Sequence, residues 1–314
     1  MRRCEAISTL GFGVLAGLSS QPVRAQGTRE KIQVAGPPAE DMTDLYYAIK
    51  TGMFGRAELD VEMVATSNGA AATTAVITGT YPIARTSMLV ILSAHLRGIP
   101  VTIVAPSIIN AISHPNGELQ IASDAAYKSG ADLNGKTMGS AGLDDLNTLA
   151  IKAWVDKTGG DSSTLRFVEI PNVAMEAAIV AHRVDAAIMQ SPQLDASLAD
   201  GACRTLAYAY GAIAPNFMGA AYVARSDWAS QHADAVRRFV RVLTEAAGYV
   251  NTHPAETAPL VAEVTKIEIG SAQKMFRTMN GTILDPALVQ PVIDVAAKYK
   301  LISRAFPAGE LFWH

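Results

Sequence analysis

Cysteine is nearly absent from this chain, and positive charge is not in excess. Cys4 and Cys203 are the two cysteines among 314 residues, and Cys4 lies in an N-terminal segment that we expect to be removed. A single remaining cysteine excludes an intrachain disulfide in the mature protein. The 26 Lys and Arg against 29 Asp and Glu give a net charge of −3. Nucleic-acid binding usually needs a basic surface, so this balance argues against a nucleic-acid partner.

Motifs for metal binding and nucleophilic catalysis are also missing. The six histidines form no pairs at four-residue spacing and no clusters with carboxylates, as a metal site would need. No Gly-x-Ser-x-Gly motif of the hydrolase type occurs. We therefore expect no cofactor, no metal and no catalysis. A hydrolase whose residues meet only in the folded chain stays open as an alternative.

Long apolar runs are restricted to the N-terminus. Ile7–Leu18 is apolar but too short to span a bilayer, and Arg2 and Arg3 precede it. Val23-Arg24-Ala25 has the small-x-Ala pattern of a cleavage site. We therefore predict that residues 1–26 are a secretory signal, cleaved after about Ala25, and that the mature protein is periplasmic. The alternative is an apolar N-terminal helix of a cytosolic protein.

The rest of the chain alternates between short apolar strands and helices. About half of the residues are apolar, enough for a sizeable core. Strands are predicted at Lys31–Ala35, Asp60–Val64 and Pro100–Ala105, and helices at Met88–Leu96 and Ala233–Val250. Short connections between them are typical of a parallel α/β sheet.

Several strand-to-helix turns carry small polar residues. These turns are Met42-Thr43-Asp44, Ser67-Asn68-Gly69, Arg85-Thr86-Ser87 and Ser140-Ala141-Gly142. In open α/β sheets such turns gather at the carboxyl ends of the strands, where ligands bind. Free N–H groups at helix starts suit an anionic or carbonyl-bearing ligand. The alternative is that these residues only cap their helices.

The alternation pauses twice, at Ser107–Gly117 and at Tyr208–Met218. We interpret both segments as crossovers between two lobes, with the ligand cleft between them. The first lobe is predicted to comprise residues 27–112 and 220–314, including the C-terminal helices, and the second lobe residues 113–219.

Five short motifs, in the order in which they occur along the chain, resemble those of a known protein family. They are Leu45–Phe54 (LYYAIKTGMF), Leu59–Met63 (LDVEM), Gly98–Val101 (GIPV), Ala131–Lys136 (ADLNGK) and Arg183–Ala187 (RVDAA). Together they resemble the periplasmic solute-binding proteins of ABC importers of the nitrate/sulfonate/taurine and thiamine-precursor type. The resemblance implies a type II periplasmic binding fold, in which two α/β lobes joined by two hinge crossovers close on a ligand.

The resemblance implies transport of a small polar or anionic solute, such as a sulfonate, a carboxylate, nitrate or a pyrimidine, to an inner-membrane ABC permease. We expect a monomer. The alternatives are an enzyme on the same scaffold, a hydrolase or a relative of the pyrimidine-precursor synthases, and a periplasmic sensor. The ligand contacts carried over to this sequence are Met42, Thr43, Asp44, Ser67, Asn68, Thr86, Ser87, Ser140, Leu143, Asp144, Asn172 and Gln190.

Arg85 is added as a candidate anion ligand. Its guanidinium matches the geometry of a sulfonate or carboxylate, although an arginine at a helix start can also just cover apolar surface. The sequence departs from the family nearby, because Thr78–Ile83 lacks the Asp of the usual Gly-x-x-Asp pattern. The cysteine cluster of the related synthases is also missing. These departures leave the ligand open.

Overall fold

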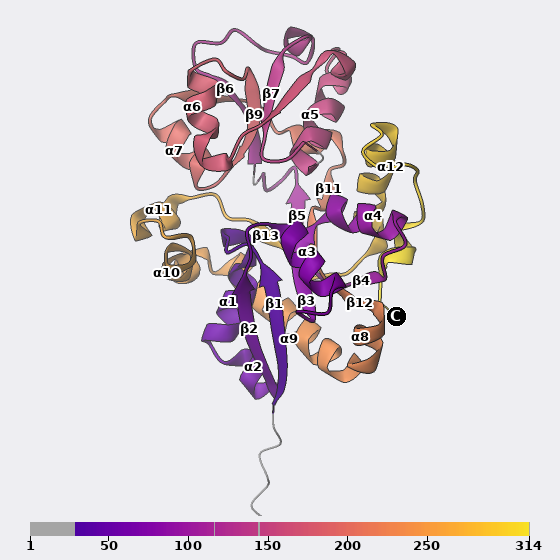
Figure 1. The fold of residues 1–314 in the computed structure, drawn as a ribbon. Coiled ribbons are helices and arrows are strands. Elements are labelled where there is room, and N and C mark those ends of the chain that lie inside the picture. The colour runs from indigo at the N-terminus through magenta and orange to yellow at the C-terminus, as the bar shows by residue number, and fades with distance from the viewer. Residues whose placement is uncertain (1–28, 116, 144, 314) are drawn as a thin grey trace, which may run out of the picture.

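The structure, a computed structural model, describes residues 29–313 except 116 and 144. The predicted signal segment, its cleavage site and Asp144 therefore lie outside the described residues. Two lobes, each built on a mixed β-sheet, lie one above the other and are joined by short strands between them (Figure 1). No helix in the described part of the chain combines the length and the apolar character needed to cross a membrane.

Lobe 1 contains the N-terminal and most of the C-terminal residues. Its sheet has the strand order β2 (Leu59–Ala65), β1 (Glu30–Gly36), β3 (Ile83–Ser87), β12 (Ala220–Arg225), β4 (Val101–Pro106). Its helices are α1 (Thr43–Lys50), α2 (Met53–Arg56), α3 (Gly69–Ile77), α4 (Met88–Leu96), α8 (Ser226–Gln231), α9 (Ala233–Thr252), α10 (Pro254–Thr265) and α11 (Ile269–Lys274).

Lobe 2 is made from the middle of the chain. Its sheet has the order β10 (Cys203–Ala207), β6 (Gly117–Ala122), β9 (Ala186–Gln190), β7 (Thr137–Ser140), β8 (Arg166–Glu169), with helices α5 (Leu146–Lys157), α6 (Met175–Val180) and α7 (Gln193–Ala199).

Short 3₁₀ helices occur in both lobes. They are η1 (Glu40–Met42), η2 (Ala131–Leu133), η3 (Ser162–Thr164), η4 (Asn172–Ala174), η5 (Ala209–Ala212), η6 (Pro286–Leu288) and η7 (Ala308–Leu311).

A third, three-stranded sheet joins the lobes. β5 (Ile108–Ala111) leaves lobe 1, β11 (Asn216–Met218) returns from lobe 2, and β13 (Met279–Asn280) pairs with the other edge of β5. β5 and β11 fall within the two segments predicted as crossovers. The predicted lobe boundaries, at 112/113 and 219/220, lie one residue after each of these strands.

The alternation predicted a parallel sheet, and in each lobe one strand departs from this. β12 runs antiparallel to β3 and β4, and β6 runs antiparallel to β9 and β10. Both reversed strands are the first after a crossing, so the chain enters them from the edge that faces the other lobe. The remaining strands of each sheet run toward that edge, and their carboxyl ends therefore face the gap between the lobes.

Burial explains why these segments form these elements. The predicted helices at 88–96 and 233–250 correspond to α4 and α9. On α9, Phe239 is fully buried, stacks on Phe54 at 5.4 Å and meets the edge of Tyr222 at 6.1 Å. The apolar face of α9 thus covers the sheet, while Arg237 and Arg241 are exposed.

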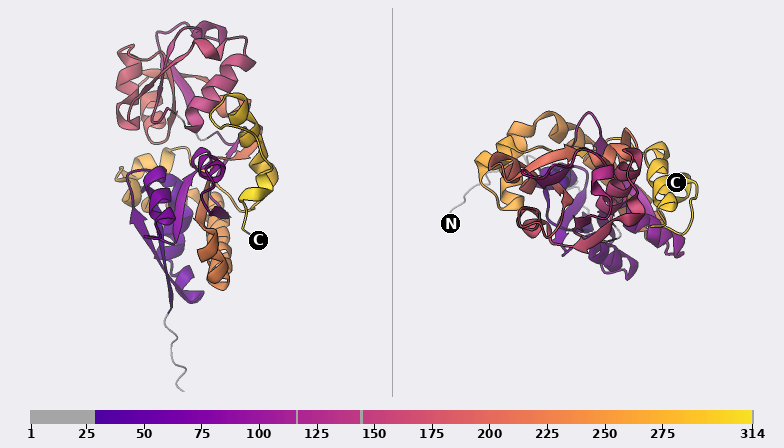
Figure 2. Two further views of the ribbon diagram at one scale, coloured as in Figure 1. Left: turned by 45° about the vertical axis from the view of Figure 1, so that its right-hand side comes forward. Right: turned by 90° about the horizontal axis from the view of Figure 1, so that it is seen from above.

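The last helix, α12 (Gln290–Lys298), connects the two lobes along one side (Figure 2). It packs against α4 of lobe 1 and α5 of lobe 2. Just beyond it, the hydroxyl of Tyr299 donates a 2.8 Å hydrogen bond to Asp156 of lobe 2. The C-terminal helices were assigned to lobe 1 from the sequence, but α12 contacts both lobes, and the hydrophobic core runs continuously past the hinge on this side.

Gly219 lies between β11 and β12, where the chain returns from lobe 2 to lobe 1. A substitution at this position tests how tightly this crossing is packed. A Cβ at this position would lie 2.2 Å from Nδ2 of Asn110, whereas a Cβ on Gly248 in α9 meets no atom within 4 Å. We expect Gly219→Ala to lower the free energy of unfolding by about 1–3 kcal/mol through overpacking. The matched variant Gly248→Ala should raise it by about 0.5–1 kcal/mol through helix propensity. Urea denaturation measures both, and equal effects would contradict the packing of the crossing.

Candidate functional site

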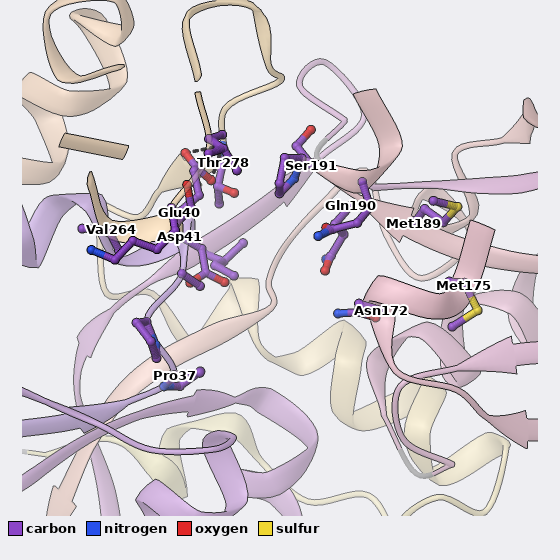
Figure 3. A pocket seen from close by; sticks show the side chains of 18 of the residues that line it. Pro37, Glu40, Asp41, Asn172, Met175, Met189, Gln190, Ser191, Val264 and Thr278 are labelled. Carbon is purple, nitrogen blue, oxygen red and sulfur yellow. Dashed lines mark hydrogen bonds between the residues drawn. The ribbon is translucent and has the colours of Figure 1, made fainter. Parts of the chain in front are cut away.

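A cavity of about 600 Å³ lies between the two lobes (Figure 3). Lobe 1 contributes the loop after β1, Arg85 of β3, the end of α10 and Thr278. Lobe 2 contributes η4, α6 and the end of β9. Glu40, Asp41 and Thr278 lie on one side of the opening, and Asn172, Met189 and Gln190 lie on the other. A ligand in this space would contact both lobes at once.

Three of the predicted residues line this cavity: Arg85, Asn172 and Gln190. Asn172 begins η4, and Gln190 ends β9 at the edge facing lobe 1. The Gln190 side chain donates a 3.3 Å hydrogen bond to the hydroxyl of Tyr210, which donates in turn to Asn147 at the start of α5. A partly buried chain of hydrogen bonds thus orients the Gln190 amide.

Arg85 lies in a strand and not in the predicted turn, because β3 continues to Ser87 by pairing with β12. Its side chain is buried. The nitrogen Nη2 lies 2.5 Å from Oδ2 of Asp41, and Nε donates a 3.3 Å hydrogen bond to Ser107. The Arg85 guanidinium, which the sequence predicts as a ligand for an anion, is therefore already paired with a carboxylate.

Met42, Thr43 and Asp44 lie behind the lobe 1 wall and are buried. Asp44 has no exposed surface, and its Oδ1 accepts hydrogen bonds from the Leu45 amide at 2.8 Å and the Tyr222 hydroxyl at 3.2 Å. Burial raises the pKa of Asp44 to about 7, and the nearby Asp41 adds to this effect. Asp44 thus joins α1 to the sheet.

The remaining predicted residues do not line the cavity. Asn68 caps α3 by accepting the Ala71 amide at 2.8 Å, and the hydroxyl of Ser140 donates to Asp145 at 2.9 Å. Asp145, the N-cap of α5, is itself buried, which raises its pKa. Thr86 is fully buried where α3 begins, and Leu143 is about half exposed. The other two are Ser67 and Ser87.

The sequence reasoning missed most of the cavity wall. Glu40 and Asp41 directly precede the turn that it selected, and Ser191 directly follows Gln190, so a window extended by two residues would have included them. The end of α10 and Thr278 line the cavity from the C-terminal region, where no local signal marks them. Only the folded chain brings these segments to the cleft.

Glu40 and Arg277 form a second buried ion pair beside the cavity. Nε of Arg277 donates to Oε1 of Glu40 at 2.7 Å, and the Thr278 amide donates to the same carboxylate at 3.2 Å. Burial raises the pKa of Glu40, and Arg277 acts against this rise. The pair holds the segment before β13 against η1.

A second cavity, of about 500 Å³, adjoins the first between α7 and α11 and shares Pro192, Gln193 and Ile267 with it. Its walls are mostly apolar, with Ala196, Ala199 and Met275. There the carboxylate of Asp195 in lobe 2 accepts a 3.3 Å hydrogen bond from the Phe276 amide of lobe 1.

No cluster of three or more His, Cys, Asp or Glu that could hold a metal ion occurs within residues 29–313, leaving aside 116 and 144. Cys203 lies buried in β10 and does not line the cavity, and burial raises the pKa of its thiol to about 11.

Asp44 predicts a pH dependence of stability. Because its pKa is about 7 in the folded protein and near 4 in an unfolded chain, the folded state binds the extra proton, so stability falls as the pH rises through this window. The slope is on the order of 1.4 kcal/mol per pH unit for this group. In Asp44→Asn this contribution is lost, so the variant should lose less stability than the wild type between pH 5 and pH 8 in urea denaturation. Equal losses of stability in the wild type and in Asp44→Asn would contradict the titration of a buried Asp44 carboxyl in this pH range.

Comparisons with known proteins agree with the two-lobed architecture. The crystal structure of the periplasmic aliphatic sulphonate-binding protein SsuA from Escherichia coli matches with a TM-score of 0.75 at 15% identity, over 91% of this chain and 92% of that one. SsuA from Xanthomonas axonopodis pv. citri, solved with bound MOPS, matches with a TM-score of 0.73 at 16% identity, over 90% and 98%. The periplasmic nitrate-binding protein NrtA from Synechocystis PCC 6803 gives 0.71 at 14% identity, over 89% and 84%.

These likenesses show that the chain has the periplasmic binding protein fold, which confirms the predicted fold class. A comparison with curated protein sequences found no match. The sequence model described as "NMT1/THI5 like" matches residues 39–257, which span both lobes. The resemblance inferred from the short motifs is thereby confirmed, and the chain belongs to the NMT1/THI5-like family.

Proposed function

We propose that this protein is the exported solute-binding component of an ABC importer. It captures a small polar organic solute between its lobes and delivers it to a permease in the inner membrane. The observation that carries the proposal is the cavity of about 600 Å³ lined by both lobes, next to the paired crossing strands β5 and β11. The family match and the periplasmic binding fold support it.

The geometry favours capture by closure. Two short crossings allow the lobes to rotate toward each other, which is the hinge motion of two-lobed binding proteins. Closure removes water from the cavity and strengthens the hydrogen bonds that its polar groups make to a solute. In this proposal, residues 27–112 and 220–314 move against residues 113–219. The chain acts as a monomer in the periplasm, with residues 1–26 directing export.

The proposed contacts to the solute come from Asn172 and Gln190 in lobe 2 and from the Arg85–Asp41 pair in lobe 1. Amide side chains both donate and accept hydrogen bonds, so they suit a polar solute whose atoms are held unchanged. The described part of the cavity wall holds no histidine or cysteine, and its carboxylates Asp41 and Glu40 are each paired with an arginine, which favours binding over catalysis.

The direct test is a thermal-shift screen of the chain from Gln26 against sulfonates, carboxylates, nitrate, amides and heterocycles. A solute at 100 times its Kd adds about 2.7 kcal/mol of stability, so the melting temperature should rise by several degrees. The solute should be recovered chemically unchanged. A chemically altered compound would support an enzyme, and the absence of any shift would contradict solute capture.

Variants of lobe 2 test whether the solute occupies this cavity. For a solute found in the screen, Asn172→Ala and Gln190→Ala should each weaken binding about tenfold in calorimetric titration, through loss of one hydrogen bond. Gln231→Ala, an exposed glutamine at the end of α8 far from the cavity lining, is the matched control and should bind like the wild type. Unchanged affinity in both lobe 2 variants would mean that the solute binds outside this cavity.

A further inference from the structure

The lobe 1 wall of the cavity carries no net positive charge. Three carboxyl groups, Glu40, Asp41 and Asp44, lie in or directly behind it with two guanidinium groups, Arg85 and Arg277. Arg85 pairs with Asp41 at 2.5 Å and Arg277 pairs with Glu40 at 2.7 Å. Each arginine is thus neutralised by its own carboxylate, and Asp44 remains as a third acidic group close to Arg85.

Lys266 is the other charged residue of the lining, and it does not change this balance inside the cavity. It lies in the loop after α10, and its side chain is exposed. It is near Glu263, whose pKa is lowered by Lys50 and, to a smaller extent, by Lys266. Glu263 is already paired with Lys50, so Lys266 is an exposed cation of the lining that lies outside the two buried pairs.

In the Arg85–Asp41 pair, one nitrogen donor of Arg85 and one oxygen acceptor of Asp41 have no hydrogen-bond partner among the described residues. Nε of Arg85 binds Ser107 and Nη2 binds Asp41, while Nη1 has no hydrogen-bond partner among the described residues. On Asp41, Oδ2 is taken, and Oδ1 is shielded from solvent without a partner there. A shielded acceptor without a donor is unfavourable, so a solute N–H or O–H group that reaches Oδ1 after a turn of the Asp41 side chain is preferred.

The opposite wall is uncharged and also both donates and accepts. It presents the amides of Asn172 and Gln190 and the hydroxyl of Ser191, whose oxygen is buried without a partner in the described structure. Amides and hydroxyls serve as donors and as acceptors. The two buried cations of the lobe 1 wall are thus each compensated, and the lobe 2 wall adds no cation for a fully ionised oxyanion.

We propose that the solute carries no net negative charge and presents a donor next to an acceptor, as an amide, a urea or a lactam does, to the Arg85–Asp41 pair, and that Asp41 makes the cavity reject oxyanions such as alkanesulfonates and nitrate. This inference rests on the proposed function and narrows its substrate class. It differs from what the names of the sulphonate-binding and nitrate-binding structural relatives would suggest.

The physical reason is the position of Asp41. Sulfonate and nitrate have acceptor atoms only, so they cannot satisfy Oδ1 of Asp41. An oxyanion at Nη1 of Arg85 would lie beside the Asp41 carboxylate, and like charges in a partly buried site repel. If the oxyanion displaced Asp41 from Arg85, that carboxylate would lose its counter-ion in a partly buried site, which is unfavourable.

Asp41→Asn tests the inference by releasing Arg85. The wild type should bind ethanesulfonate and nitrate at least tenfold more weakly than Asp41→Asn in calorimetric titration at low ionic strength. The gain should disappear in the double variant Asp41→Asn/Arg85→Met. Asp60→Asn removes an equal charge at the exposed start of β2 and should show no gain. Circular dichroism and melting curves establish that each variant is folded, and Asp41→Ser serves as a second variant if the first is not.

The same titrations include an amide and urea series. Compounds of this series should bind the wild type and bind Asp41→Asn at least tenfold more weakly. Tight binding of ethanesulfonate or nitrate by the wild type, or no gain in a folded Asp41 variant, would overturn the inference while leaving solute capture intact. If neither series bound the wild type or the variants, the inference would be overturned, whereas the proposed function fails only if no compound of the thermal-shift screen binds.

Discussion

The pairing of the two crossing strands, β5 and β11, is the constraint on which the rest of the structure depends. Since both crossings lie side by side, the chain passes between the lobes at one place, an arrangement that suits a hinge. The chain must also enter β6 and β12 from the edge that faces the other lobe, which reverses these two strands. All other strands of the two main sheets then end at that edge, and the segments after β1, β8 and β9 line the cavity.

The electrostatics of the cavity follow from this arrangement. The loop after β1 brings Glu40 and Asp41 to the cleft, β3 brings Arg85, and the segment before β13 brings Arg277. These residues are distant in the sequence, yet they form two buried ion pairs because their elements end at one edge. A buried ion pair contributes little net stability, because the charges lose their hydration. Its value here lies in fixing donors and acceptors in one orientation.

Sequence patterns predicted the elements well because their causes are local. Helical spacing marked α9, and the cap residue Asn68 marked the start of α3. Asn172 and Gln190 were predicted from the family resemblance, which places ligand contacts in the loops at strand ends, and both line the cavity. Arg85 was assigned to a turn because the residues after it are polar, but pairing with β12 extends the strand, and no local pattern encodes that partner.

What the sequence could not predict depends on tertiary contacts. The pairing of Arg85 with Asp41 joins residues 44 positions apart, and it reverses the expectation of a free guanidinium waiting for an anion. The end of α10 and Thr278 reach the cavity only because the C-terminal helices fold back over lobe 1. Likewise, α12 looks like any amphipathic helix in the sequence, and only its neighbours α4 and α5 reveal that it connects the lobes.

The distance across the cleft is the most direct measurement of the central claim, that the lobes close on a solute. Spin labels at cysteines replacing Val173 on η4 of lobe 2 and Ile269 on α11 of lobe 1, two exposed positions, would report it by pulsed electron resonance, with Cys203 buried and replaced by serine. Addition of a solute that raises the melting temperature should shorten and narrow the distance distribution. An unchanged distribution at saturating solute would contradict closure and, with it, the account of how this protein works.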